Sequence, residues 1–204
     1  MASVQKFTHK AVVNQLRHNN RTIENPSNSD IDGLKKDGNY RLSPDRQITD
    51  YEYYKQRKSE LYCYNREDVK TMCGWVVTAP VDLAHEQHRE FFKETYNFLE
   101  KRYGENNVVQ AIVHNDESGQ PHLHFCFIPA LPDLKHGGEK FCANDILTRS
   151  ELRKFHPDLQ KHLQENNINA RVLTGITSAQ GGNRTVEELK KDRERERERG
   201  VIIF

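Results

Sequence analysis

Residues 114–125 read HNDESGQPHLHF, and the sequence around this stretch predicts a β-hairpin. Apolar side chains are frequent in NNVVQAIVHND (residues 106–116) before the turn and in PHLHFCFIPA (residues 121–130) after it. The intervening DESGQ has the Asp, Ser and Gly content of a short connection between strands. The two strands are therefore expected to run antiparallel, side by side in one sheet.

The histidines of this hairpin are expected on one face of the sheet. Successive side chains of a strand point to opposite faces, so His122 and His124 share a face while Leu123 points to the other. In the preceding strand, His114 shares its face with Gln110. Pairing of the strands brings His114 beside the other two histidines, and the apolar face with Leu123 is expected to cover the core.

Three neutral imidazoles at one point can bind a divalent transition metal and leave positions open for an exchangeable ligand. No fourth protein ligand stands at suitable local spacing, which favours an open site that grips substrate oxygens over a closed structural zinc site. Asp116 and Glu117 in the turn are candidates for orienting the imidazoles or for acting as a base. Any one of these histidines alone would suit a half-exposed polar face. The three together predict a metal centre.

Outward from the hairpin, the sequence mixes strand and helix patterns. Strands are expected at ASVQKF (2–7), CGWVVTAP (73–80) and, at a sheet edge, INARVLTGI (168–176). Helices are expected from Thr8 to about 18–21, from the capping box at Thr49, from Asp82 to Tyr103 before Gly104, and from a second capping box at Thr148 that precedes Leu152, Phe155, Leu159 and Leu163 on one face. Together these elements predict an α+β fold, a central antiparallel β-sheet with helices packed on one side.

The composition excludes several classes of protein. The 204 residues suit one large domain or one domain with arms, and 31 Lys and Arg against 30 Asp and Glu exclude a polycation or an acidic solvating chain. No apolar run approaches the roughly 18 residues of a membrane span, and the N-terminus lacks a secretory signal. The four cysteines are scattered, with no CxxC, which is typical of reduced thiols. We therefore expect a cytoplasmic protein without a membrane span.

The N-terminal segment has no acidic residue before Glu24. At helical spacing, Arg17, His18 and Arg21 come close together near the expected end of the first helix. Arginine pairs with phosphate through two hydrogen bonds, and neutral histidine is nucleophilic or basic near pH 7. By residue type alone this group is a candidate phosphate site, and a basic helix end that complements the helix dipole explains it equally well.

Three motifs resemble, in the same order, those of the plasmid mobilisation relaxases. They are RHNNR (17–21), NYRL (39–42) and HNDESGQPHLHF (114–125). More narrowly they are similar to the Mob/Pre (MobV-type) branch of the HUH endonucleases, with its H-N-x-R, N-Y-x-L and H-x-D-E…P-H-x-H motifs. The resemblance runs from about residue 4 to about residue 190. The turn at 118–120 is one residue longer than the family's, which a hairpin loop can absorb.

The resemblance implies a HUH relaxase-like fold and a DNA strand transferase. Such enzymes nick one strand at an origin of transfer and stay joined to its 5′ phosphate. The implied nucleophile is His18, through a phosphoramidate, with Arg21 as a phosphate or nucleophile positioner and Glu117 as the acidic residue of the third motif. The metal held by the hairpin histidines, Mn²⁺ or Mg²⁺ before Zn²⁺, Ni²⁺ or Co²⁺, would polarise the scissile phosphate.

The resemblance also implies partners and boundaries. DNA contacts are expected from Lys6, Lys10, Arg17, Asn19, Arg21 and Tyr40. The expected partners are origin DNA, single-stranded or as a hairpin, other transfer proteins, and a second copy through a C-terminal region beyond this chain. A relaxase domain is expected over residues 1–190, followed by an Arg/Glu-rich tail at 191–204 that starts a longer C-terminal region.

Two alternatives remain open. A rolling-circle replication initiator or a transposase would share the metal site and use Tyr40 as nucleophile, with Tyr51, Tyr53 and Tyr54 as further candidates. A phenol has a pKa of about 10 and needs a nearby cation or metal to attack at pH 7. The second alternative is a metal-stabilised DNA-binding module that never cleaves.

Overall fold

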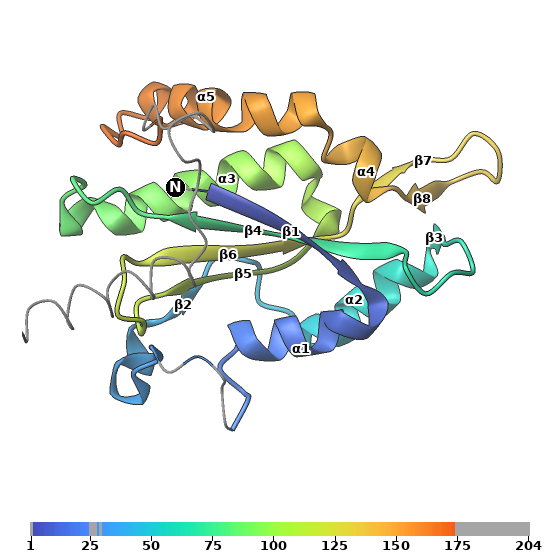
Figure 1. Ribbon diagram of the computed structural model, residues 1–204, viewed down its shortest axis with the longest axis horizontal. Helices are drawn as coiled ribbons and strands as arrows, with labels where there is room; N and C mark the ends of the chain where they lie inside the picture. The colour runs from blue at the N-terminus through green and yellow to red at the C-terminus, as the bar shows by residue number, and fades with distance from the viewer. Residues whose placement is uncertain (1, 25–27, 29, 174–204) are drawn as a thin grey trace, which may run out of the picture. The chain divides into compact units, whose positions relative to one another are not determined.

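The computed structural model describes residues 2–24, 28 and 30–173. The tail predicted at 191–204 and the end of the domain predicted over 1–190 lie outside these residues. An antiparallel sheet has the strand order β1–β4–β6–β5–β2, and a smaller sheet has the order β3–β8–β7 (Figure 1). The strands are β1 (Ala2–Thr8), β2 (Tyr40–Arg41), β3 (Leu61–Tyr62), β4 (Lys70–Thr78), β5 (Val108–His114), β6 (His122–Phe127), β7 (Ala130–Pro132) and β8 (Glu139–Phe141). The helices are α1 (His9–Asn19), α2 (Asp50–Ser59), α3 (His88–Tyr103), α4 (Ala143–Ile146) and α5 (Arg149–Glu165), with 3₁₀ turns η1 (Gly33–Gly38), η2 (His85–Gln87) and η3 (Glu105–Asn107).

The predicted hairpin is confirmed as β5 and β6, which lie inside the larger sheet between β4 and β2. His114 pairs directly with His122, and Ile112 pairs with His124. Side chains directly opposite each other on antiparallel strands lie on the same face. The register therefore sets all three hairpin histidines on one face of the sheet.

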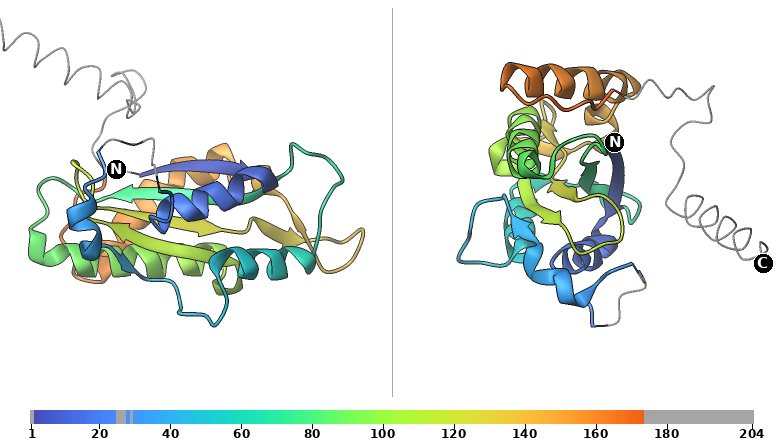
Figure 2. Two further views of the ribbon diagram at one scale, coloured as in Figure 1. Left: turned by 90° about the horizontal axis from the view of Figure 1, so that it is seen from below. Right: turned by 90° about the vertical axis from the view of Figure 1, so that its left-hand side faces the viewer.

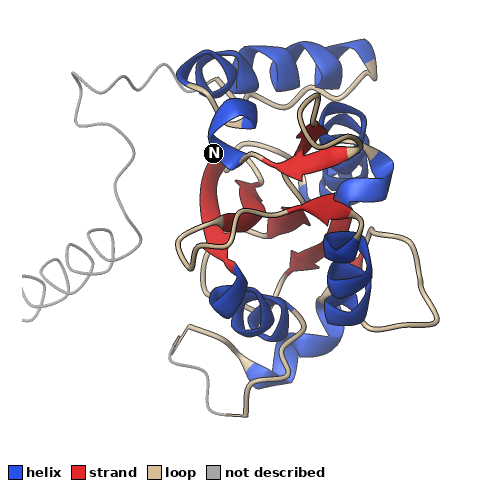
Figure 3. Ribbon diagram, turned by 90° about the vertical axis from the view of Figure 1, so that its right-hand side faces the viewer, coloured by secondary structure: helices blue, strands red, loops and turns tan. Residues whose placement is uncertain are grey.

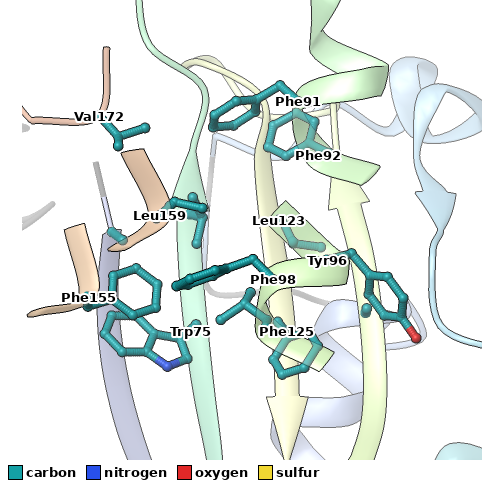
Figure 4. Packing of buried hydrophobic residues seen from close by; sticks show 14 of the residues in the cluster. Trp75, Phe91, Phe92, Tyr96, Phe98, Leu123, Phe125, Phe155, Leu159 and Val172 are labelled. Atoms are coloured by element: carbon teal, nitrogen blue, oxygen red, sulfur yellow. The ribbon is translucent and has the colours of Figure 1, made fainter. Parts of the chain in front are cut away.

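The other face carries the larger hydrophobic core, under α3 and α5 (Figures 1 and 4). Trp75 of β4 stacks on Phe155 of α5 with ring centroids 3.7 Å apart, and its indole nitrogen donates to the Tyr103 hydroxyl at the end of α3. Phe98 of α3 meets Phe155 edge to face, beside the same tryptophan (Figure 4). Aromatic side chains from one strand and two helices thus join the sheet to its outer layers.

The histidine face is covered as well, so the expectation of helices on one side only is wrong. A second cluster packs Val12 and Leu16 of α1 and Tyr54 of α2 against the sheet. Figures 2 and 3 show helices on both sides of the strands. A β-bulge at the start of β5 turns Val109 into this second cluster, because one extra residue reverses the alternation of faces. The histidines therefore lie at the end of a covered face.

Other boundaries differ from the sequence-based expectation. Asp82 caps no helix, because Leu83 closes a turn by donating to the Pro80 carbonyl, and α3 begins only at His88. Gly104 ends α3 as predicted, with φ of +92°. The edge strand expected at 168–176 is absent from 168–173, where the chain has no regular structure. Ile168, Ala170 and Val172 are nevertheless buried against the core, which explains the strand-like apolar pattern.

Helix α5 shows how one amphipathic face anchors the outer layer. Its N-cap Thr148 accepts from the Glu151 amide as predicted, and Pro157 lies inside the helix without ending it. Leu159 is 0% exposed, whereas Leu152, expected on the same face, is 42% exposed. Within the part of the chain that the structure describes, no helix is long and apolar enough to cross a membrane.

These exposures give a matched pair of variants on one helix. Leu159→Ala is expected to lower the free energy of unfolding by about 2–5 kcal/mol, because it leaves a cavity in a packed core. Leu152→Ala is expected to change it by less than about 1 kcal/mol, because this residue is already exposed to water and its loss leaves no closed cavity. Urea denaturation measures both, and equal effects would contradict the assignment of the buried face.

Candidate functional site

The three hairpin histidines form a compact cluster on the covered face of the sheet. The ring centroids of His114 and His124 are 4.5 Å apart, and that of His122 lies 5.4 Å from His114 and 4.9 Å from His124. One ring nitrogen from each residue lies within 4.8 Å of the others, so a single ion could contact all three. The predicted metal ligands are thus brought together.

Hydrogen bonds fix which ring nitrogen is free in His114 and in His122. His114 Nε2 lies 2.8 Å from the Asn19 carbonyl, which can only accept, so this nitrogen donates and Nδ1 is left as the acceptor. His122 Nδ1 likewise faces the Gln120 carbonyl at 3.2 Å, which leaves Nε2. His114 Nδ1 and His124 Nε2 are buried and have no hydrogen-bond partner among the described residues. Buried nitrogens normally have partners, so this donor set fits a metal ion.

Burial keeps His114 and His124 neutral. Desolvation lowers the pKa of His114 to about 4, although its hydrogen bond to Asn19 opposes the shift. Desolvation and the neighbouring histidines lower the pKa of His124 well below its usual value. Both rings are therefore unprotonated at pH 7, which is the form that binds a metal.

Helix α1 brings a fourth histidine to this cluster. Val12 and Leu16 bury one side of α1 against the sheet, and the helix ends just after His18. The His18 ring centroid lies 6.4 Å from that of His114 and 6.1 Å from that of His124. Burial and the charge of Arg21 lower the pKa of His18, so its ring is also neutral at pH 7.

The end of α1 is built around an unusual arginine. The Thr22 amide donates to the Arg17 carbonyl and the Arg21 amide donates to the His18 carbonyl, the two bonds of a Schellman motif. Arg21 holds the left-handed position of this motif with φ of +55°, where glycine is usual. The strain, of order 1 kcal/mol, requires compensation from the side chain.

The Arg21 side chain finds that compensation in the hairpin turn. Its Nε and Nη2 donate to the two Asp116 oxygens at 2.7 and 2.6 Å, and Nη2 also donates to Glu117 Oε1 at 2.8 Å. Only 6% of the Arg21 side chain is exposed. Glu117 Oε1 in turn lies 3.8 Å from His122 Nε2. Arg21 thus links the end of α1 to the turn that carries the metal ligands.

Asp116 is the most buried member of this group. Burial alone would raise its pKa, but the hydrogen bonds from Arg21 outweigh burial and hold the pKa at about 2. Its backbone carbonyl also accepts from the Asp32 amide at 2.7 Å. Asp116 is therefore an ionised anchor for the turn, a role that its sequence position alone did not distinguish from that of a base.

Tyr40 lies away from the cluster. Its partner across strands β2 and β5 is Val113, which belongs to the core face, and the Tyr40 side chain packs against that core under the guanidinium of Arg89. Burial raises the pKa of Tyr40. Tyr54, another candidate, is buried with its hydroxyl hydrogen-bonded to Thr71.

The predicted DNA-binding residues occupy different settings. Arg17 is exposed beside His18, Lys10 pairs with Glu67 on the surface, and Lys6 donates to Asn144. Asn19 is 1% exposed, so its side chain has no surface to offer DNA. The structure gives Asn19 a supporting position inside the fold instead.

Several residues at the site were missed from the sequence. A cavity of about 160 Å³ is lined by His18, Arg21, Ile23, Ile31, Gly33, Lys36 and Asp116, and another of about 180 Å³ by Asn19, Asn20, Arg21, Lys36, Asn39, Tyr40, Arg41 and Ile112. Lys36, in the 3₁₀ turn η1, donates to the Arg21 carbonyl. Gln110 and Asp50 lie buried beneath the cluster. The one available signal was Gln110, a polar residue within an apolar strand.

The whole of this arrangement lies within a match to a known family. Residues 1–198 match the family model described as plasmid recombination enzyme. The chain belongs to the plasmid recombination enzyme family. A plasmid recombination enzyme of Bacillus thuringiensis is 32% identical over 79% of this chain and 36% of its own length. One of Streptococcus agalactiae is 29% identical over 94% of this chain and 38% of its own length. The chain thus spans little more than a third of these relatives.

A solved structure supports the same assignment. The MobM relaxase domain (MOBV; Mob_Pre), Mn-bound and bound to plasmid pMV158 oriT DNA, aligns with a TM-score of 0.73 and 26% identity. The alignment covers 94% of this chain and 97% of the other. The expected family and the relaxase-like fold are both confirmed.

The geometry of the cluster predicts how the loss of one histidine affects metal binding by this chain. His124→Ala is expected to lower Mn²⁺ affinity by at least about 100-fold, since loss of an outer-shell partner alone costs 10- to 100-fold. His88→Ala is the matched control, because this half-buried ring on α3 also hydrogen-bonds to a carbonyl. Isothermal titration with MnCl₂ measures both, and unchanged affinity in His124→Ala would reject the site.

The Arg21–Asp116 pair predicts a pH-dependent stability difference. Asp116→Asn leaves the buried Arg21 guanidinium with Glu117 as its remaining carboxylate partner, so at pH 6 it is expected to lower the free energy of unfolding by about 3–5 kcal/mol. The carboxylate has a pKa of about 2 in the fold and about 3.9 when unfolded. Its stabilising effect is therefore complete above about pH 4 and is lost as the pH falls towards 2.

Urea denaturation at pH 6 and pH 3 measures this difference, which should shrink at the lower pH. Asp68→Asn is the control, because this carboxylate is 74% exposed and pairs only on the surface. A loss of stability in Asp116→Asn that is equal at both pH values would contradict the ion pair.

Proposed function

We propose that this chain is a relaxase domain that nicks single-stranded DNA at an origin of transfer and stays joined to the 5′ phosphate through His18. The observation that carries the proposal is the position of the His18 ring, 6.1 Å from His124 and 6.4 Å from His114. A nucleophile beside a three-histidine centre suits attack on a phosphate that the centre holds. The similar MobM relaxase domain bound to oriT DNA supports the same substrate.

The metal centre would consist of His114 Nδ1, His122 Nε2 and His124 Nε2, the nitrogens that the hydrogen bonds leave free. A bound divalent ion supplies positive charge to the scissile phosphate. Mn²⁺ is the first candidate, since the MobM structures are Mn-bound, and Mg²⁺, Zn²⁺, Ni²⁺ and Co²⁺ are alternatives.

The chemical step needs only a neutral imidazole. A ring nitrogen of His18 donates its lone pair to phosphorus, a P–N bond forms, and the bond from phosphorus to the 3′ oxygen breaks. The proton lost from the second ring nitrogen balances the proton that the 3′ oxygen gains. The lowered pKa of His18 keeps the attacking form populated at neutral pH. The product is a phosphoramidate, which the 3′ hydroxyl can reverse to reseal the strand.

Tyr40 is disfavoured as the nucleophile. Its side chain packs on the core face, whereas the histidine cluster lies on the opposite face of the same strands. Burial raises its pKa, which also makes the phenolate scarcer. This orientation weighs against Tyr40 as the nucleophile of a replication initiator or transposase.

Arg21 and Glu117 are proposed to act together at the edge of the metal centre. Arg21 pairs with both Asp116 and Glu117. It would therefore act on a phosphate only together with these two carboxylates. Glu117 is then held beside His122, where it can orient the ring. Exposed basic residues around the site, among them Arg17 and Lys36, would follow the DNA backbone, with Lys6 and Lys10 further along β1 and α1.

The role of the whole protein follows by extension. We propose that it initiates mobilisation of a plasmid or another mobile element in the bacterial cytoplasm, with origin DNA and other transfer proteins as partners. The relaxase domain is proposed to occupy residues 1–190. A region after residue 204 is proposed to supply a dimer contact, consistent with relatives that are longer than this chain.

The nucleophile can be tested by the chemistry of the covalent adduct. Labelled origin oligonucleotide incubated with the protein and Mn²⁺ should give an adduct that survives alkali and is lost in acid, since a phosphoramidate is acid-labile. His18→Ala should reduce adduct formation by at least about 1000-fold while retaining DNA binding. Tyr40→Phe and His85→Ala, an exposed histidine on η2, should keep wild-type rates.

Two results would overturn this assignment. An acid-stable adduct that maps to Tyr40 would replace the nucleophile. DNA binding without nicking of supercoiled plasmid or oligonucleotide under any divalent metal would instead identify a non-cleaving DNA-binding module.

A further inference from the structure

We infer that a chain of hydrogen-bonded polar side chains, Arg41–Asp50–Gln110–Asn19, positions both His18 and His114, with Gln110 and Asp50 as positioning residues. Asp50, Gln110 and Asn19 are buried, and Arg41 closes the chain at the surface. This inference deepens the proposed function and rests on it for the catalytic readout, while its metal readout is independent. The four residues come from β2, α2, β5 and α1, so one connected chain crosses four elements of the histidine face.

Gln110 is the centre of the chain. It is 0% exposed and lies on the same face of β5 as Ile112 and His114, opposite Cys126 of β6. Its Oε1 accepts from Asn19 Nδ2 at 2.8 Å, and its Nε2 donates to Asp50 Oδ2 at 2.7 Å. Because both ends of the amide are used, its orientation is fixed by its partners.

Asp50 accepts hydrogen bonds from Gln110 and from two residues beyond it, Arg41 and Asn20. Arg41 binds it through two hydrogen bonds of 2.8 Å, and Asn20 Nδ2 donates to it at 3.1 Å. Asn20 Oδ1 also accepts from Arg41 at 3.2 Å, so the residue after α1 is held from both sides. The carboxylate at the start of α2 therefore fixes the point where α1 ends.

Asn19 connects this hydrogen-bonded chain to the candidate site at two points, His114 and His18. Its side chain is held by Gln110, by Cys126 Sγ at 3.4 Å and by Gln15 Nε2 at 2.8 Å. Its carbonyl accepts from His114 Nε2, which selects the tautomer with Nδ1 free. Its covalent neighbour is His18. A single buried residue therefore sets the position of the proposed nucleophile and the donor atom of a proposed ligand.

Physical reasoning explains why such a chain would be placed here. A buried polar network is costly when it is incomplete and gives a unique geometry when every member is satisfied. An apolar contact between α1 and β5 would let the helix end slide or turn. Hydrogen bonds of fixed direction allow one arrangement, as a site with tolerances below about 1 Å requires.

The experiment compares variants that remove the chain with one that removes a similar buried group elsewhere. Gln110→Met keeps the volume and deletes the hydrogen bonds, and Asp50→Asn breaks the far end without touching Asn19. Arg57→Met is the control, because Arg57 lies on α2, is 9% exposed, and binds Glu60, Glu139 and Asn107 away from the histidines. Each substitution is made in the full 204-residue chain.

Three readouts separate positioning from stability. Titration with Mn²⁺ alone should show affinity about tenfold or more weaker for Gln110→Met, weaker in the same direction for Asp50→Asn, and unchanged for Arg57→Met. The ¹⁵N NMR signal of His114 Nε2–H should shift or broaden in the first two variants only. On an origin oligonucleotide that the wild type cleaves, kcat should fall about tenfold or more with KM within about twofold.

The outcomes are separable. If Gln110→Met and Asp50→Asn lose as much unfolding stability as Arg57→Met but keep wild-type Mn²⁺ affinity, NMR signal and kcat, the chain is structural only and the inference fails. If Gln110→Met does not fold, Asp50→Asn decides alone by the same readouts. If the wild type cleaves no DNA, the proposed function fails, and the Mn²⁺ affinities still decide the inference.

Discussion

The antiparallel register of β5 and β6 is the constraint on which the site depends. Because His114 pairs with His122, and Ile112 with His124, the three imidazoles meet on one face while Leu123 and its neighbours fill the core. A slip of one residue would exchange these faces, burying imidazoles in the main core and moving its phenylalanines to the face covered by α1 and α2. The hydrophobic core under α3 and α5 therefore also enforces the register that builds the metal centre.

Helices α1 and α2 cover the histidine face, bury the cluster and add a fourth histidine to it. Without α1 and α2, the histidines would lie on an open sheet face. Packing of Val12 and Leu16 brings the end of α1 to the cluster, adds His18, and excludes water from His114 and His124. The same burial that makes the rings neutral leaves two of their nitrogens without partners among the described residues, a cost that a bound ion would remove.

The charged residues at the site restrain one another through ion pairs. The strained backbone of Arg21 is held by Asp116 and Glu117, and the turn that carries those carboxylates is held by Arg21. Behind it, Asp50 and Gln110 form a separate polar layer between α1 and the sheet. Similarity to the MobM relaxase domain places this architecture in a family whose related structures bind oriT DNA.

Local sequence patterns determined much of this protein. Alternation around residues 106–130 predicted the hairpin and the shared face of its histidines, and the capping residues at Thr49 and Thr148 predicted the starts of two helices. The order of the motifs indicated the family. These are properties of spacing along the chain, which backbone geometry converts into faces and helix starts.

Only the tertiary structure decided the rest. That helices cover both faces, that Tyr40 points away from the histidines, and that Asn19 is buried all depend on contacts between elements far apart in the sequence. Residue types specify what a side chain can bind, but the partner that it meets, and whether water reaches it, are set by how the helices and the sheet pack together.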